Sequence, residues 1–164
     1  MDARIECFEP VACSDARLLI LGTMPSVESL RPSCYYSHPR NTFWPIMAEI
    51  LGEPRPESVE KKKSMLLRHQ IALWDVARSC VRPGSLDSAM RDVIPNDFAA
   101  LYARCPGIER ILFNGATAQK LYQKLVSAMP EGCSWAQMPS TSPAYTLAYE
   151  KKLALWRSGM EELI

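Results

Sequence analysis

The chain has 164 residues, of which 48% are hydrophobic and 23% are charged, the composition of an ordinary folded domain. Its formal net charge is only +1, which excludes a histone-like binder of nucleic acid. A chain of this length buries roughly two-thirds of its unfolded surface, so residues 1–164 are expected to form one domain without a disulfide or a structural metal ion.

The six cysteines are scattered, and no two have the CxxC spacing of a zinc or redox site: Cys7, Cys13, Cys34, Cys80, Cys105 and Cys133. We expect reduced, mostly buried thiols, as in a cytoplasmic protein. The amino-terminal segment MDARIECFEP lacks the apolar region of a signal peptide, and no apolar run approaches the length of a membrane span. These features predict a cytoplasmic protein that does not bind a membrane.

The first predicted element is a strand, followed by a long loop and a helix. Residues 17–22 form an apolar run that ends in glycine, which is typical of a central parallel strand. The loop over residues 23–40 is long, and loops of this kind are usually functional. A helix with an apolar stripe follows, and its N-cap is Asn41 or Thr42.

The rest of the chain keeps alternating between strand and helix patterns. The expected elements are a polar helix over 57–69, a strand over 71–76, a helix capped by Asn96 and ending near Arg104, a strand over 110–113, a helix over 115–128, a strand over 134–138 and a last helix that starts at Pro143. This alternation predicts an α/β fold, in which helices cover both faces of a parallel sheet.

Ligands of such folds bind in the crevice at the carboxyl ends of the strands. The rule selects four segments, namely residues 22–26, residues 75–79, Asn114 with Gly115, and residues 139–144. Functional side chains are expected in these places.

The first of these segments is Gly22-Thr23-Met24-Pro25-Ser26. Its glycine lets a ligand approach the backbone, and the N–H groups that follow can bind an anion or a carbonyl group. The segment matches neither the GxGxxG nor the Walker pattern, and an ordinary strand-to-loop turn is an equal alternative.

Residues 35–44, YYSHPRNTFW, gather aromatic, histidine, arginine and amide side chains at a helix entrance. Aromatic rings stack on any nucleobase, and an amide can orient water or bond a base edge. In the alternative interpretation the aromatic residues fill the core and Asn41 only caps the helix.

Residues 139–144, PSTSPA, place three hydroxyl groups before the helix predicted to start at Pro143. Hydroxyl and free N–H groups at a helix N-terminus form a phosphate site. The alternative for Ser142 is a simple N-cap.

Five segments occur in an order that resembles the uracil-DNA glycosylase superfamily, above all its hypoxanthine-DNA glycosylase branch, family 6: LGTMPS, YYSHPRNTFW, IALWDVARSCVRPGSLDS, ILFNGATA and MPSTSPA. The resemblance runs from about residue 18 to residue 156. It implies a three-layer α/β/α sandwich with a four-stranded parallel sheet. It also implies a monofunctional DNA N-glycosylase of base-excision repair, which flips a damaged nucleotide out of the duplex and hydrolyses its glycosidic bond.

The resemblance also assigns residues. Most relatives have Asp or Asn at the position of Met24 to handle the attacking water, whereas the hypoxanthine branch uses an amide that maps onto Asn41, the expected catalytic residue. The expected base-binding residues are Gly22, Thr23, Met24, Tyr36, Asp75 and Asn114. The expected DNA-binding residues are Ser26, Arg40, Ser140, Thr141, Ser142 and Ala144, with Ala144 or Tyr145 in the wedge that fills the vacated stack. The implied partner is damaged DNA, bound by a monomer without a metal ion or cofactor.

The chemistry of the reaction is compatible with these assignments. Cleavage places negative charge on the departing base, and the lactam of hypoxanthine delocalises that charge better than adenine can, so an oriented amide suffices without a paired carboxylate. As a carboxylate, Asp75 can accept the N1–H of hypoxanthine or the N3–H of uracil, and it would reject adenine, which has no N–H there. The alternative is that Asp75 only caps local backbone.

Three other functions stay open at this point. An enzyme of the same fold could remove uracil, for example from a G·U mismatch, or xanthine. A catalytically inactive module could bind damaged DNA with the same fold. An unrelated α/β hydrolase or nucleotide-binding domain has less support, because the sequence has no G-x-S-x-G motif.

Overall fold

The computed structural model of the protein describes residues 4–30 and 34–161. Its centre is a parallel four-stranded sheet with the strand order β3-β2-β6-β7. The strands are β2 (Leu18–Gly22), β3 (Ile71–Asp75), β6 (Arg110–Asn114) and β7 (Ser134–Met138). The predicted parallel sheet is therefore confirmed.

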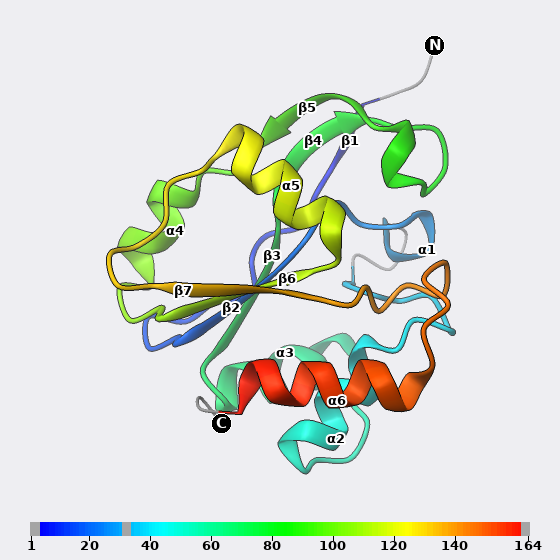
Figure 1. Cartoon of the computed structure of the whole chain (residues 1–164), viewed down its shortest axis with the longest axis vertical. Coiled ribbons are helices and arrows are strands. Elements are labelled where there is room, and N and C mark those ends of the chain that lie inside the picture. The colour runs from blue at the N-terminus through cyan, green and yellow to red at the C-terminus, as the bar shows by residue number, and fades with distance from the viewer. Residues whose placement is uncertain (1–3, 31–33, 162–164) are drawn as a thin grey trace.

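Helices cover both faces of this sheet, as Figure 1 shows. One face carries α2 (Phe43–Leu51), α3 (Val59–Arg68) and α6 (Tyr149–Met160), and the other carries α4 (Phe98–Arg104) and α5 (Ala116–Leu125). Alternate residues of β2 divide between two cores, since Leu18 and Ile20 pack in the first and Leu19 and Leu21 in the second. The implied three-layer α/β/α sandwich is confirmed.

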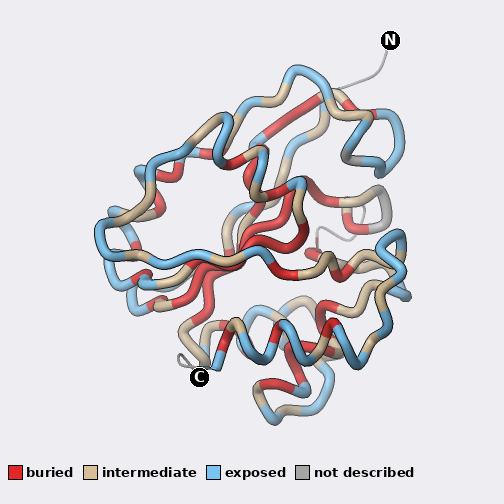
Figure 2. The backbone as a smooth tube through the Cα atoms, in the orientation of Figure 1, coloured by how far each residue is buried: buried red, intermediate tan, exposed pale blue. Residues whose placement is uncertain are grey.

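Burial follows from this layering. Figure 2 shows the buried residues gathered along the central strands, and every residue of β2 is buried. A strand covered on both faces needs apolar side chains on both, which explains why its sequence is a continuous apolar run. None of the described helices is both long and apolar enough to cross a membrane.

A second, antiparallel sheet was not predicted. Its strands, in the order β1-β4-β5, are β1 (Arg4–Glu6), β4 (Ala77–Val81) and β5 (Arg91–Pro95). These strands carry several exposed polar residues and irregular pairing, so neither an apolar run nor a clean alternation marks them. The sheet matters for function because Ala77 and Cys80 form a small core with Met24, in the loop after β2.

The start of α4 and the end of α5 differ from the predictions. The cap of α4 is Asp97, whose side chain accepts the Ala100 N–H at 3.0 Å, and not Asn96, which turns inward. Helix α5 ends at Leu125, so the prediction that it extends to residue 128 is wrong. Ser127 adopts a left-handed backbone conformation with φ of 57°, which stops the helix, and Ala128 is exposed.

The predicted start of the last helix at Pro143 is also wrong. Ser142 accepts the Ala144 N–H with its side chain and the Tyr145 N–H with its backbone oxygen, which makes a turn instead of an N-cap. The backbone is extended at Ala148, and α6 begins only at Tyr149. Residues 143–148 therefore form a loop, so PSTSPA does not lie at a helix N-terminus. Within the predicted loop over 23–40, one short helix, α1 (Val27–Leu30), is present.

The six cysteines are all free. Cys34, Cys80 and Cys105 are buried, but Cys13 is exposed, so the expected burial holds only for part of them. Burial raises the pKa of the Cys7 thiol to about 11, against the lowering effect of its hydrogen bond with Asn96. This thiol therefore stays protonated at neutral pH.

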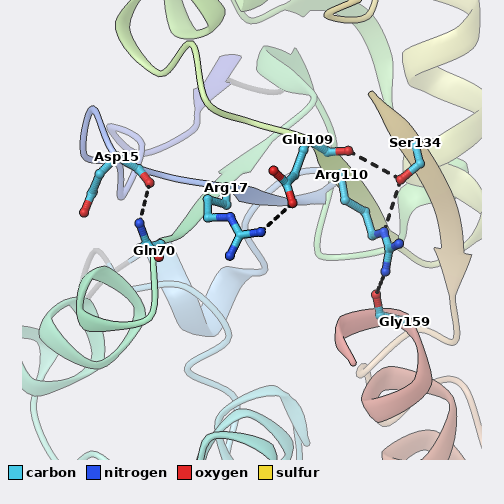
Figure 3. Close-up of polar contacts among 7 residues, drawn as sticks. All are labelled: Asp15, Arg17, Gln70, Glu109, Arg110, Ser134 and Gly159. Carbon is cyan, nitrogen blue, oxygen red and sulfur yellow. Dashed lines mark hydrogen bonds and ion pairs between the residues drawn. The ribbon is translucent and has the colours of Figure 1, made fainter. Parts of the chain in front are cut away.

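Polar side chains tie the amino-terminal ends of the strands together, as Figure 3 shows. Arg110 of β6 donates from Nε to Ser134 Oγ at 3.1 Å and from Nη1 to the backbone oxygen of Gly159 at 2.8 Å. It thereby joins β6 to β7 and to α6. Nearby, Arg17 forms a solvent-exposed ion pair with Glu109 at 2.7 Å.

This arrangement predicts that Arg110→Met lowers the free energy of unfolding by about 1–3 kcal/mol, because hydrogen bonds from a charged group are lost. Arg17→Met is the matched control, since an exposed ion pair contributes only about 0–1 kcal/mol. Urea unfolding of the two variants provides the measurement. If both variants lost the same free energy of unfolding, Arg110 would stabilise the fold no more than an exposed ion pair does.

Candidate active site

A cavity lies at the carboxyl ends of the parallel strands, where α/β folds bind their ligands. Its volume is about 120 Å³, several times what one water molecule needs. The lining residues come from the ends of β2, β3 and β6 and from the loops around them: Gly22, Thr23, Met24, Pro25, Ser26, Ser29, Tyr35, Tyr36, Asn41, Asp75, Ser85, Asn114, Ser140, Thr141 and Ser142.

Most of the predicted site residues therefore meet around one cavity. Arg40 and Ala144 are the exceptions, because both are exposed and neither belongs to the lining. Four lining residues were not predicted: Pro25, Ser29, Tyr35 and Ser85. Ser85 lies in one of the segments that carry the family resemblance, but no local pattern singled it out, because its loop reaches the cavity only through tertiary contacts.

Gly22 allows two functional groups to converge. It ends β2 and is the register partner of Asp75, which ends β3. A Cβ atom at Gly22 would lie 2.6 Å from Asp75 Oδ1 and 2.6 Å from the Tyr36 hydroxyl oxygen, closer than real contacts of this kind. Glycine is thus the residue that leaves room for the carboxylate and the phenol.

Tyr36 is held in an unusual backbone conformation. Its φ of 55° lies in the left-handed region, which costs a non-glycine residue on the order of 1–3 kcal/mol and is common at functional sites. Its ring packs on the fully buried Phe43, with 4.3 Å between ring centroids and 36° between planes. This packing positions the hydroxyl beside Gly22.

Asp75 provides the acidic side chain of the cavity. It is 2% exposed, and among the described residues of the lining it is the only carboxylic acid. Its backbone oxygen accepts the Asn96 side-chain amide at 2.7 Å, which holds the end of β3. Burial and then the Asp75 carboxylate raise the pKa of Tyr35 far above its usual value, so that phenol stays neutral and donates to the backbone oxygen of Glu9.

Asn41 lies in a tight turn before α2. Its backbone N–H donates to the His38 carbonyl oxygen at 2.9 Å, and His38 Nδ1 accepts the Arg40 N–H at 3.0 Å. The N-cap residue of α2 is Thr42, and the side-chain oxygen of the preceding Asn41 accepts the Phe43 N–H at 3.0 Å, which satisfies the first N–H of the helix. Its NH₂ group has no hydrogen-bond partner in the described part of the chain, and this donor is available to a ligand in the cavity.

Asn114 and Thr141 form a reciprocal buried pair. Asn114 donates from Nδ2 to Thr141 Oγ1 at 3.0 Å and accepts the Thr141 N–H at 2.9 Å. The Thr141 carbonyl oxygen in turn accepts the Thr42 N–H at 3.0 Å. The pair links β6, the PSTSPA loop and the start of α2, and it fully buries the Thr141 side chain.

Helix α6 holds the PSTSPA loop from behind. Trp156 donates from Nε1 to the Pro139 oxygen at 3.0 Å, and Lys152 donates from Nζ to the Ser142 oxygen at 3.1 Å. Burial lowers the pKa of Lys152, whose ammonium also lies 5.5 Å from the centre of the exposed Tyr145 ring. These contacts with α6 hold in place the loop that carries Ser140, Ser142 and Tyr145.

These groups suit the recognition of a flat, polar ring. A buried carboxylate can accept an N–H, an amide can donate to a ring nitrogen or carbonyl oxygen, and the surrounding hydroxyl groups can bind an anionic backbone. Across residues 4–30 and 34–161, no three or more His, Cys, Asp or Glu side chains gather as a metal site would require.

Comparisons with known proteins agree on one family. A model of the uracil DNA glycosylase superfamily matches residues 9–163. A hypoxanthine DNA glycosylase of Methanosarcina acetivorans is 35% identical over 92% of this chain and 94% of its own length, and one of Methanosarcina barkeri is 34% identical over 74% and 77%. The solution NMR structure of a candidate uracil DNA glycosylase from Methanosarcina acetivorans superposes with a TM-score of 0.84 at 33% identity, covering 98% of this chain and 99% of that one.

Proposed function

Because this chain belongs to the uracil DNA glycosylase superfamily and is a DNA N-glycosylase, we propose that the base it excises is hypoxanthine, the deaminated form of adenine. Both curated Methanosarcina relatives carry the name of that activity. The observation that carries the proposal is the cavity itself, which combines a buried carboxylate at Asp75 with an available amide donor at Asn41.

Asp75 is proposed to read the flipped base. A carboxylate accepts the N1–H of hypoxanthine, whereas adenine has only an acceptor at that position. Adenine would place the lone pair of its N1 against an oxygen of Asp75, and two facing acceptors are costly in a site shielded from water. Uracil presents its N3–H and is therefore the competing substrate.

Asn41 is proposed to be the catalytic residue. Hydrolysis breaks the bond from C1′ of the deoxyribose to the base nitrogen and forms a bond from C1′ to a water oxygen, and the proton of that water ends on the base. The Asn41 NH₂ can donate to the base as it gains negative charge, or hold the water. Met24 cannot take this role, because a thioether does not orient water and this side chain packs on Ala77 and Cys80.

The residues predicted to bind DNA are proposed to hold the duplex. Ser26, Ser140 and Ser142 present hydroxyl groups at the lining, and the exposed Arg40 and Ala144 are placed outside it, where duplex would pass. Because the Thr141 side chain is buried, Thr141 supports DNA binding by anchoring the loop and does not contact the DNA itself. Asn114 positions that loop. We further propose that the chain acts as one domain and as a monomer.

The substrate assignment is tested with purified protein and matched duplexes that contain deoxyinosine, deoxyuridine or deoxyxanthosine. Chromatography of the released base, with a chelator present, identifies the product and tests the proposed independence from metal ions. We expect hypoxanthine to be released fastest. Faster release of uracil or xanthine would overturn the choice of base, and tight binding of all three duplexes without release would favour a non-catalytic binder.

Gly22→Ala is expected to slow excision at least about tenfold while the protein stays folded. The added Cβ would lie 2.6 Å from both Asp75 Oδ1 and the Tyr36 hydroxyl, so both groups must move away from the base. Single-turnover kinetics measures the effect. Gly52→Ala is a suitable control. Nothing lies within 4 Å of its Cβ position, and its φ of 67° is left-handed, so this substitution tests the effect of backbone strain without a steric clash.

A further inference from the structure

A second cavity shares one wall with the cavity proposed to hold the base, here called the base cavity. The volume of the second cavity is about 280 Å³, against about 120 Å³ for the base cavity. An apolar protein cavity of about 150 Å³ is large enough to bind benzene. Among the described residues, Tyr35 alone lines both cavities. The second cavity is therefore a separate space that is large enough for a small aromatic molecule.

Three aromatic side chains line the second cavity, namely Phe8, Tyr35 and Trp44. Phe8 and Tyr35 meet edge to face, with 5.1 Å between ring centroids. The Tyr35 hydroxyl donates to the backbone oxygen of Glu9 at 3.2 Å, and Trp44 donates from Nε1 to the Tyr35 oxygen at 2.7 Å. These hydrogen bonds hold the rings in place, so little conformational entropy is lost when a flat ring packs against them.

Helix α3 supplies the basic side of the second cavity. Val59, Lys62 and Lys63 all belong to its lining, as expected for residues three and four apart, which share one face of a helix. Lys61 is exposed and lies outside this lining. Two of the three consecutive lysines of α3 therefore line a cavity, although such a run is usually a solvated face.

The lysine charge in the second cavity is not balanced by the protein. Lys62 is half-buried, and its Nζ lies 5.4 Å from the centre of the Trp44 ring and 3.6 Å from the Sγ of Cys34. Neither Lys62 nor Lys63 forms an ion pair within the described part of the chain. Glu9 is the one acidic residue in the described lining, so two lysines leave an excess of one positive charge. A partly desolvated ammonium without a carboxylate partner favours an anionic ligand.

We propose that the second cavity is a binding site for a small aromatic carboxylate, with its ring against the aromatic side chains and its carboxylate at Lys62. Apolar walls with a few polar groups are the usual composition of small-molecule sites. Burial raises the pKa of Tyr35, so its phenol stays neutral and does not repel the anion. This site is additional to the base cavity, and its occupation does not depend on which base the protein excises.

Isothermal titration calorimetry tests the proposal with indole-3-acetate and benzoate. Indole-3-acetamide and benzamide are the neutral analogues of the same shape, and acetate is the anion without a ring. We expect at least one aromatic carboxylate to bind about tenfold or more tightly than both its amide and acetate, because Lys62 donates a charge-assisted hydrogen bond to it. Lys62→Met keeps the apolar stem and should remove the preference over the amide. Lys61→Met is the matched control, since it removes the same charge from the same helix outside the cavity.

Chemical-shift mapping by NMR locates the bound probe. The indole N–H of Trp44 and the backbone N–H of Val59 should shift most. Largest shifts at Gly22 and Asn114 would place the probe in the base cavity and overturn the proposal.

Four results of the calorimetry would overturn it as well: no binding of either carboxylate, equal affinity for carboxylate and amide, equal affinity for acetate, or unchanged affinity in Lys62→Met. None of these measurements uses base excision, so the outcome is independent of the proposed substrate.

Discussion

Asn41→Ala is expected to slow release of hypoxanthine by on the order of a hundredfold or more, the cost of removing one oriented donor from a developing negative charge. The same substitution also removes a hydrogen bond at the start of α2, because Asn41 Oδ1 accepts the Phe43 N–H. A loss of activity in Asn41→Ala alone therefore does not separate catalysis from a loosened helix α2.

Asn41→Asp separates these two roles. Aspartate keeps the oxygen that accepts the Phe43 N–H and is as good a helix cap as asparagine, so thermal stability should match that of the wild type. It lacks the NH₂ donor and adds negative charge where the departing base gains it. We expect Asn41→Asp to be at least as slow as Asn41→Ala in single-turnover assays. If Asn41→Asp excised hypoxanthine at the wild-type rate, the amide donor would have no part in catalysis.

The parallel sheet was predictable because each of its strands is marked by the local pattern of residues along the chain. Strands such as β2 are short apolar runs bounded by polar loops, and the rule that ligands bind at their carboxyl ends then selected Gly22, Asp75 and Asn114 without any coordinates. The position of Asn41 at the cavity depended on the family resemblance, because the capping alternative explained the same residue equally well. In the structure the Asn41 oxygen accepts the Phe43 N–H at the start of α2 and Asn41 also lines the cavity, so the geometry is compatible with both descriptions and the catalytic role stays a proposal.

The parts that escaped prediction depend on contacts between distant segments. Ser85 lines the cavity from a loop that Arg82 holds in place by donating to the oxygen of Pro25, 57 residues earlier, and no local pattern encodes that contact. Pro143 is a good first residue of a helix, yet the hydrogen bonds from Ala144 and Tyr145 to Ser142 make a turn there. The loop that results carries the exposed Tyr145.

Asp75→Asn is expected to lower kcat/KM on deoxyinosine DNA by about 10- to 100-fold, because it replaces a charge-assisted hydrogen bond to N1–H with a neutral one. The change is nearly isosteric, so the close approach of this side chain to Gly22 persists. An asparagine can also donate its NH₂ to the bare N1 of adenine, which the carboxylate rejects. The variant should therefore lose selectivity as well as rate.

Inhibition by the free bases measures that selectivity directly. Hypoxanthine should inhibit the wild-type protein more strongly than adenine, and in Asp75→Asn this preference should shrink or disappear, because the position now offers both a donor and an acceptor. Asp97→Asn is the matched control: it makes the same chemical change at the exposed cap of α4, where asparagine serves equally well. An unchanged rate together with an unchanged preference for hypoxanthine would show that Asp75 does not read the base, and specificity would then have to come from the backbone of the loop after Gly22.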